Sequence, residues 1–190
     1  SRQKVLILAY APHPDLQAIR SAIADNESYN VDVQLVKDFK GSIADYSMVV
    51  WHQLPGMGGA GASLITTAIE KKIPGMFVWG MSTDFNAFNA LNLGVSLGNF
   101  RNNTTDISGS MQESFNTFNW ETGFPGLIRM LPPMQVPFGD LSFSPGIQTA
   151  VVQQVGTIKT SKPLIAFNEI RESKFGFILG EGLWRWRSTS

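Results

Sequence analysis

Short continuous apolar runs, separated by segments of helical periodicity, organise the first half of this chain. Three runs are apolar throughout, at Val5–Ala9, Met48–Trp51 and Met76–Trp79. Such runs are typical of strands buried on both faces of a sheet. A fourth segment, Val31 to Val36, is less uniformly apolar and predicts a more exposed strand. Strands that alternate with helical segments predict a parallel sheet, here in the order 2-1-3-4.

The segments between these runs predict the helices. Pro14 suits the first turn of a helix, and the following residues to Ile23 place apolar side chains on one helical face. Ala62–Lys72 predicts a second helix, and Asp84–Leu91 predicts a short third one with Asp84 near its start. The expected fold class is therefore α/β, a flavodoxin-like open sheet with helices on both faces.

The second half is less regular. Leu93–Asn119 is rich in Asn, Ser, Thr and Gly, and its short apolar alternations predict a hairpin laid on the domain. Phe124–Leu131 has a helical pattern that ends before two prolines. Three further strands are predicted, at Gln148–Val155, Pro163–Ile170 and Lys174–Leu179. Because helices are scarce there, we expect antiparallel strands that extend the parallel sheet of a single domain, residues 1–190.

Composition excludes several classes of function. Fifteen basic residues balance fifteen acidic ones, so the chain lacks the basic excess of a nucleic-acid-binding protein. There are no cysteines, which excludes disulfides, thiolate metal ligands and a cysteine nucleophile. No stretch approaches the roughly 20 apolar residues of a membrane helix. Ser1 is not a natural start, so we expect a processed or excised domain with any membrane anchor outside it.

The first candidate site follows the first apolar run. His13, Pro14 and Asp15 resemble part of the His-Pro-Asp-Asp zinc motif of PIG-L/LmbE-type deacetylases, but Leu16 replaces the second aspartate. His52, the only other histidine, follows the third strand, so both histidines are expected at the switch point of the sheet. Two hypotheses stay open. Each histidine fixes a nearby loop, or the two histidines and Asp15 bind a metal weakly.

The turn after the fourth strand is the second candidate. Ser82 follows Gly80 by two residues, where α/β hydrolases carry a nucleophile, but Asp84 replaces the second glycine of the G-x-S-x-G motif. Backbone N–H groups at Gly80–Ser82 are expected to point into the cleft, but a catalytic serine also needs a base, and no histidine follows His52. The glycine cluster at 56–61 lacks both dinucleotide-binding spacing and a Walker lysine.

The closing segment is the third candidate. If it is a strand, Trp184 and Trp186 share one face, and Arg185 and Arg187 share the other. The tryptophans are then expected to fill the core, with an aromatic and cationic binding surface as the alternative.

Four short motifs resemble the class I glutamine amidotransferase-like superfamily. The resembling residues are Ala11-Pro12-His13-Pro14-Asp15, Val50-Trp51-His52-Gln53-Leu54-Pro55, Ile73-Pro74 with Val78-Trp79-Gly80, and Gly180-Glu181-Gly182-Leu183-Trp184-Arg185-Trp186-Arg187. The last is similar to the end of such domains in Bacteroidetes-type membrane proteins, beside von Willebrand-type or BatA-like segments. The resemblance implies a periplasmic domain of a cell-envelope protein, with a cytoplasmic location as the alternative. It also implies a catalytic cysteine and a late histidine, and this chain has neither.

We therefore expect no catalytic residues, no cofactor, no bound metal and no amidotransferase activity. The expected function is a non-catalytic ligand-binding or protein-interaction domain, whose partner is a small molecule or another protein. The alternative is a metal-assisted hydrolase that uses His13, Asp15 and His52. The candidate ligand-binding residues are His13, Asp15, His52, Gln53, Gly80, Ser82, Trp184 and Arg185.

Overall fold

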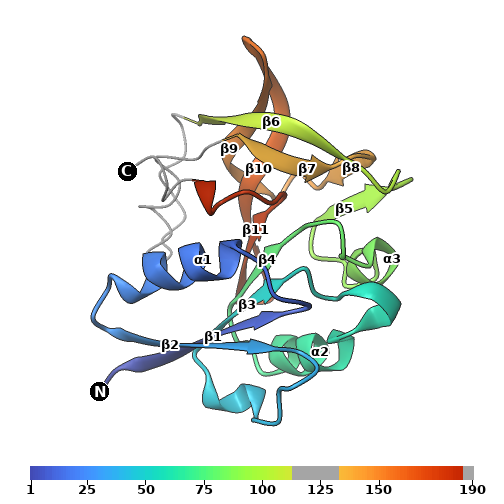
Figure 1. Ribbon diagram of the computed structural model, residues 1–190. Helices are drawn as coiled ribbons and strands as arrows, with labels where there is room; N and C mark the ends of the chain where they lie inside the picture. Colours follow the sequence, from blue (N-terminus) through green and yellow to red (C-terminus); the bar gives the residue numbers. More distant parts are fainter. Residues whose placement is uncertain (113–132, 186–190) are drawn as a thin grey trace.

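A computed structural model of the protein describes residues 1–112 and 133–185 (Figure 1). Its main feature is a mixed sheet of nine strands in the order β2-β1-β3-β4-β11-β10-β9-β6-β7. The parallel strands of the first half are β1 (Gln3–Ala9), β2 (Tyr29–Leu35), β3 (Met48–His52) and β4 (Gly75–Val78). The predicted order 2-1-3-4 is thus confirmed, as is the extension by strands of the second half.

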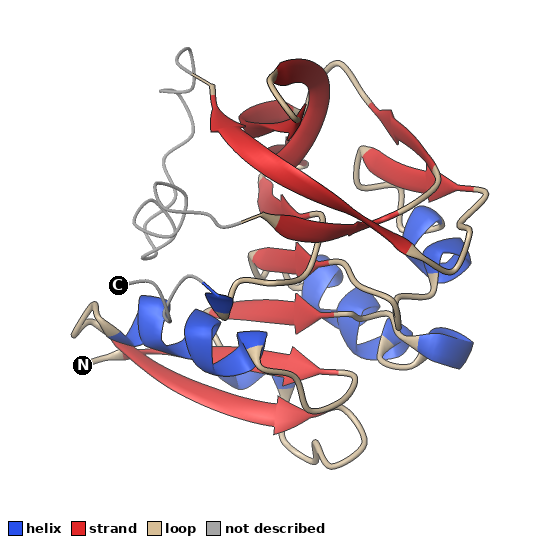
Figure 2. Cartoon of the chain, turned by 45° about the horizontal axis from the view of Figure 1, so that its top comes forward, coloured by secondary structure: helices blue, strands red, loops and turns tan. Residues whose placement is uncertain are grey.

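Two helices cover opposite faces of the parallel strands (Figures 1 and 2). Helix α1 (Asp15–Ala24) packs with Val5 and Ile7 of β1. Helix α2 (Ala62–Glu70) packs in a second core cluster, which holds Leu6 and Leu8 of the same strand. Alternate residues of one strand point to opposite faces, so a continuous apolar run is what a doubly covered strand requires.

The helix expected after the fourth strand is also present. Helix α3 (Phe85–Asn89) begins where Asp84 accepts a hydrogen bond of 3.0 Å from the backbone N–H of Ala87. This is the N-cap role that favours aspartate at the start of a helix. Phe85 and Phe88 of α3 each pack edge-on against Trp79, which anchors the helix to the sheet.

The outer half of the sheet is built from the strands of the second half. Their bounds are β6 (Thr104–Met111), β7 (Met134–Pro137), β9 (Gln148–Val155), β10 (Ile158–Ile170) and β11 (Ser173–Ile178). Beyond β11, Gln135 of β7 and Glu181 exchange two backbone hydrogen bonds of 2.8 and 2.9 Å. The chain after β11 therefore closes the five outer strands into a small barrel, visible as the curled strands in Figure 2.

Two expectations about this half need correction. Strand β11 is antiparallel to β10 as expected, but it joins β4 in parallel, so the parallel part of the sheet has five strands. Strand β5 (Val95–Gly98) pairs with β8 (Asp140–Phe143) in a separate ribbon, and it forms no hairpin with the described residues 99–112. Residues 113–119 of the expected hairpin lie outside the described residues. Pairing direction and partner are decided by long-range contacts, which local alternation does not encode. The helix expected at Phe124–Leu131 lies outside the described residues.

The closing segment also differs from the strand prediction. Residues 183–184 form a turn, Trp184 is 43% exposed, and Leu183 is the residue buried in the core. The interpretation of Trp184 as a core residue is therefore wrong, because the turn directs Leu183 inward instead. Trp186 and Arg187 lie outside the described residues.

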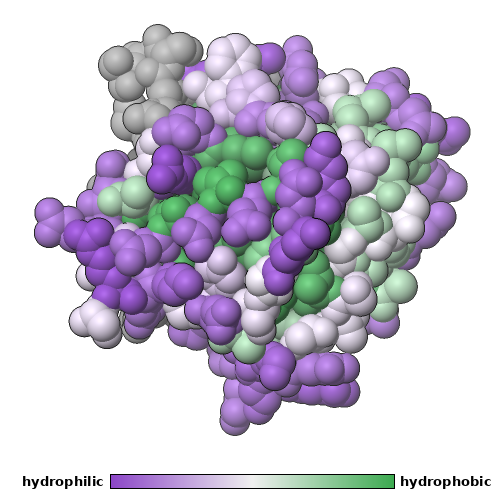
Figure 3. All heavy atoms as spheres, turned by 60° about the horizontal axis from the view of Figure 1, so that its bottom comes forward, coloured by the Kyte–Doolittle hydropathy of each residue, from purple (hydrophilic) through white to green (hydrophobic). Residues whose placement is uncertain are grey.

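The surface in Figure 3 shows a band of apolar groups recessed among polar side chains. In residues 1–112 and 133–185, no helix combines the length and apolar character that crossing a bilayer requires.

Candidate functional site

The candidate site lies where four neighbouring parallel strands end. Strands β1, β3, β4 and β11 are adjacent in the sheet and run in the same direction, so the loops after them meet at one edge. The chain leaves β1 toward β2 on one side and returns with β3 on the other, which makes this edge the switch point of the sheet. The structure brings most of the predicted site residues together here.

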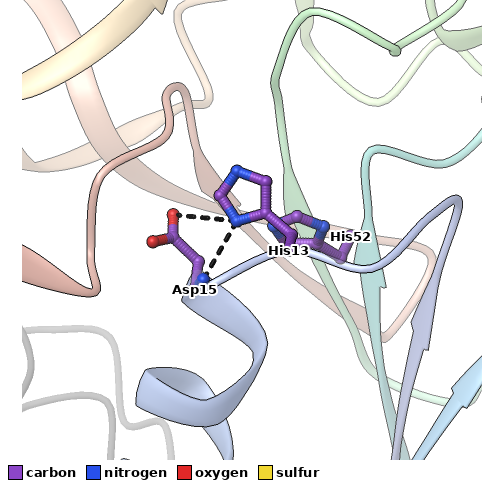
Figure 4. Close-up of side chains that lie close together, drawn as sticks. All are labelled: His13, Asp15 and His52. Atoms are coloured by element: carbon purple, nitrogen blue, oxygen red, sulfur yellow. Dashed lines mark hydrogen bonds and ion pairs between the residues drawn. The ribbon is translucent and has the colours of Figure 1, made fainter.

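The two histidines are in contact, as Figure 4 shows. His13 lies in the loop after β1, His52 is the last residue of β3, and their ring centroids are 4.8 Å apart. The Nδ1 atom of His13 accepts a hydrogen bond of 2.9 Å from the backbone N–H of Asp15. Nδ1 therefore carries a lone pair, and the proton of the neutral ring lies on Nε2.

Both carboxylate oxygens of Asp15 accept hydrogen bonds. It is fully buried at the first residue of α1, and its two carboxylate oxygens accept backbone N–H bonds of 2.8 Å from Gly182 and Trp184. The carboxylate also gains from its place at a helix N-terminus. Asp15 thus ties the end of the chain to the beginning of α1, across 167 and 169 residues of sequence.

Glu181 is the residue that sequence reasoning missed. Its carboxylate lies 3.2 Å from Nε2 of His13 and accepts a short hydrogen bond from the side-chain amide of Gln53. The carbonyl oxygen of the same amide accepts the backbone N–H of Ser82 at 2.9 Å. Glu181, Gln53 and Ser82 therefore form a chain of bonds that joins the loops after β11, β3 and β4. The only sequence signal for Glu181 was its place in the closing motif.

In the turn after β4, the N–H groups of Gly80 and Ser82 are both occupied. The backbone N–H of Gly80 donates to the Thr83 hydroxyl at 3.0 Å, and the N–H of Ser82 is taken by Gln53. The expectation that these N–H groups point into a cleft as free donors is therefore wrong for both residues. Among the described residues, no hydrogen bond joins the Ser82 hydroxyl to His13 or His52.

Burial and charge set the protonation of the two histidines in opposite directions. Burial, and then the positive charge of protonated His13, lower the pKa of His52 from 6.5 to about 3. Burial alone would lower the pKa of His13 as well, but the hydrogen bond to Glu181 and the charges of Asp15 and Glu181 raise it above 6.5. The Asp15 N–H at Nδ1 opposes this rise, because it stabilises the neutral ring. His52 is therefore a neutral core residue.

His13, Asp15 and His52 are the residues that come nearest to a metal site. Each offers a ligand atom, and these atoms lie within 4.8 Å of one another. Zinc ligands at bonds of about 2 Å in a tetrahedron lie about 3.3 Å apart, so the cluster would have to contract. The Nδ1 of His13 and both oxygens of Asp15 already accept backbone hydrogen bonds. His52 Nε2 is buried without a partner in the described part of the chain.

The remaining candidates lie beside this network. Trp184 contributes its backbone N–H to Asp15, while its ring stays on the surface with the Arg185 guanidinium 5.7 Å from the ring centroid. The structure therefore places Trp184 and Arg185 at the same edge as the histidines, but outside the buried network.

No protein-family model and no curated protein matches the chain. Solved structures do resemble it. PurLQS from Thermotoga maritima matches over 95% of this chain and 88% of its own, at 8% identity and a TM-score of 0.57. A GMP synthase-type protein from Thermoplasma acidophilum matches over 95% and 84%, at 11% identity and a TM-score of 0.50.

The β-galactosidase of Rahnella sp. R3 matches over 99% of this chain at 10% identity and a TM-score of 0.58. The chain spans only 30% of that enzyme. At these identities the similarities show the fold alone. The chain has a glutamine amidotransferase-like α/β fold without cysteine, as its sequence motifs indicated.

Proposed function

We propose that this chain is a non-catalytic ligand-binding or protein-interaction domain of a bacterial cell-envelope protein. One observation carries the proposal. The polar groups at the switch point are bonded to one another and to the end of the chain, through Asp15, Gln53 and Glu181. Groups that satisfy one another internally have a structural task. Among the described groups of this site, the Nε2 atom of His52 is left without a partner.

The requirements of acyl transfer support the first part of the proposal. This chemistry needs an activated nucleophile, a base in hydrogen-bond reach and free donors for the oxyanion. The chain has no cysteine, the Ser82 hydroxyl has no histidine partner among the described residues, and the N–H groups of Gly80 and Ser82 are occupied. We infer that the network stabilises the fold and does not catalyse amide or ester hydrolysis.

Exposed apolar side chains around the same edge support a binding role. Met57, Met81 and Trp184 follow β3, β4 and β11 in the chain, and they are 64%, 42% and 43% exposed. Because these strands are neighbours, the three side chains belong to loops of one edge. Large apolar side chains gathered at one surface are typical of interaction sites, with methionine suited to adaptable contacts. We call Met57, Met81 and Trp184 the apolar rim.

The placement in the cell envelope is supported by the resemblance of the closing segment to domains of bacterial membrane proteins. On this proposal the domain works on the periplasmic side, and any membrane contact comes from segments outside this chain. A second candidate function, a metal-assisted hydrolase, is favoured by the short distances among His13, Asp15 and His52. The hydrogen bonds that occupy His13 and Asp15 argue against it.

Assays of the purified chain separate the two candidates. We expect no turnover of glutamine or p-nitrophenyl acetate above a Ser82→Ala control, with or without added Zn²⁺. Zn²⁺ titrated into the protein and into a His13→Gln variant is expected to give the same weak binding in calorimetry. Zinc-dependent turnover that His13→Gln abolishes would establish the hydrolase and overturn the proposal.

The binding role is tested by site-specific photocrosslinking in cells that produce the full-length protein. We expect a photoreactive residue at Met81 to give a discrete adduct, whereas the same residue at Ile158, which is 69% exposed at the start of β10, gives none. Equal labelling from both positions would contradict a binding role for the apolar rim.

A further inference from the structure

The outer barrel encloses a cavity of about 200 Å³. Its walls follow the two-residue period of strands, because Thr105 and Ile107 of β6 line it, as do Gln153 and Val155 of β9. The ribbon of β5 and β8 covers one side. The cavity is therefore the inward face of the barrel, and it shares no residue with the switch-point site.

Burial changes along this cavity from one end to the other. Trp79, Leu97 and Leu179 line its floor and are at most 3% exposed. Phe138 and Val155 also line it, yet they are 51% and 54% exposed. The cavity thus has a buried, largely apolar floor and a mouth whose apolar side chains face solvent. An apolar body enters such a space with its polar end left at the mouth.

The charge at the mouth is positive. Lys162 of β10 lines the cavity and is exposed, whereas none of the lining residues is acidic. In residues 1–112 and 133–185, no ion pair joins Lys162 to a carboxylate of the chain. A lysine at the mouth of an apolar cavity binds an anionic group with its ammonium and contacts the adjoining hydrocarbon chain with its methylenes.

We propose that this cavity binds a medium-chain carboxylate, with the hydrocarbon on the apolar floor and the carboxylate at Lys162. A volume of about 200 Å³ equals that of roughly seven molecules of liquid water, which is room for a chain of about eight carbons. The inference is independent of the proposed function of the switch-point edge, because the two sites are separate.

Calorimetry with sodium butyrate, hexanoate, octanoate and dodecanoate tests the fit to the cavity. Each buried methylene is expected to tighten binding about fourfold up to octanoate. The gain is expected to stop beyond that length, because further carbons remain outside the mouth. No detectable binding of any of these acids at millimolar concentration would overturn the proposal.

Matched variants test the place of binding. Thr105→Trp puts a large side chain into the mouth, and we expect it to weaken octanoate binding at least tenfold. Asp106→Trp adds the same side chain to the opposite face of β6 and is expected to change nothing. Thermal unfolding shows whether both variants fold. Equal octanoate affinity in the two folded variants would place binding elsewhere and contradict the proposal.

A second pair tests the carboxylate contact. Lys162→Met is expected to weaken octanoate binding about two- to fivefold, which is the size of an exposed charge contact, and to leave the affinity for 1-octanol unchanged. Lys159→Met removes a charge from the same strand without touching the cavity lining and is expected to affect neither ligand. If Lys162→Met affects acid and alcohol equally, the proposed orientation is wrong.

Discussion

The parallel and the barrel halves of the sheet fill their interiors in different ways. In the parallel half, Val5–Ala9 are completely buried, and the side chains of Asp15 and Gln53 at the strand ends are bonded to the segment after β11. In the barrel half, a cavity of about 200 Å³ remains among the strands, and apolar side chains at its mouth face solvent. In open α/β sheets the switch point is the usual ligand site. Here the segment after β11 is bonded to the switch-point side chains, and the cavity of about 200 Å³ lies in the barrel.

Glu181 connects the two halves. Its backbone bonds to Gln135 close the barrel, while its side chain contacts His13 and Gln53 of the parallel half. The same short segment also supplies the N–H groups that Asp15 accepts. Residues 181–184 therefore join the two halves, and we call this segment the clasp. Substitutions that remove its bonds should lower the stability of both halves.

The largest effect is expected from Asp15→Ala. Two backbone N–H groups would lose hydrogen bonds to a charged acceptor, each worth about 1.5–3 kcal/mol, so we expect a loss of about 3–6 kcal/mol in the free energy of unfolding. Urea unfolding measures it. Asp25→Ala, at the exposed end of α1, is the control and should change stability by less than about 0.5 kcal/mol. A loss below about 1 kcal/mol for Asp15→Ala would show that the clasp contributes little.

The next effect is the loss of stability at low pH that His52 causes. His52 has its pKa lowered to about 3 in the folded state, so it stays neutral while the unfolded chain takes up a proton below pH 6.5. Its contribution to stability is full above pH 6.5 and is lost as the pH falls toward 3. Between pH 7 and 5 this amounts to about 2 kcal/mol. We expect His52→Phe to remove this part of the loss in unfolding free energy between pH 7 and 5. Parallel stability curves for the two proteins between pH 7 and 5 would refute this.

The same Val→Ile substitution should change the free energy of unfolding in opposite directions in the two halves. Val50→Ile adds a methyl group to a fully packed strand of the parallel half and is expected to cost about 1–2 kcal/mol. Val136→Ile adds the same group to the wall of the cavity and is expected to stabilise by up to about 0.8 kcal/mol. Chemical unfolding of both variants gives the comparison. Equal losses would mean that the barrel is as tightly packed as the parallel sheet.

The same contrast explains how much could be predicted. The order of β1 to β4 followed from the sequence because buried parallel strands leave long apolar runs, and the contact of His13 with His52 followed from that order. Strand β9 was predicted at its observed bounds. The parallel pairing of β11 with β4 was not, because strand direction depends on residues far apart in sequence.

The missed features have a common cause. Glu181 lies beside His13 and is also paired with Gln135 of β7, and the cavity is lined by residues of β7 and of the strands around it. Neither depends on a local pattern: Gly-Glu-Gly looks like an ordinary turn, and the lining residues come from strands and loops far apart in the chain. Local periodicity predicts which residues are buried in a strand, but not whether the space they enclose is filled.

The smallest expected effect tests the link between the halves at His13. Glu181→Gln removes a negative charge 3.2 Å from Nε2 but keeps an oxygen that accepts from Gln53. We therefore expect the pKa of His13 to fall toward its ordinary value, measured by NMR titration of the ring protons. The raised pKa of His13 contributes stability that is present below pH 6.5 and is lost as the pH rises through the pKa of the folded state. The stability of the variant should not show this dependence on pH. Glu172→Gln, a substitution at an exposed turn, is the control. An unchanged His13 titration in Glu181→Gln would mean that Asp15 alone sets the pKa.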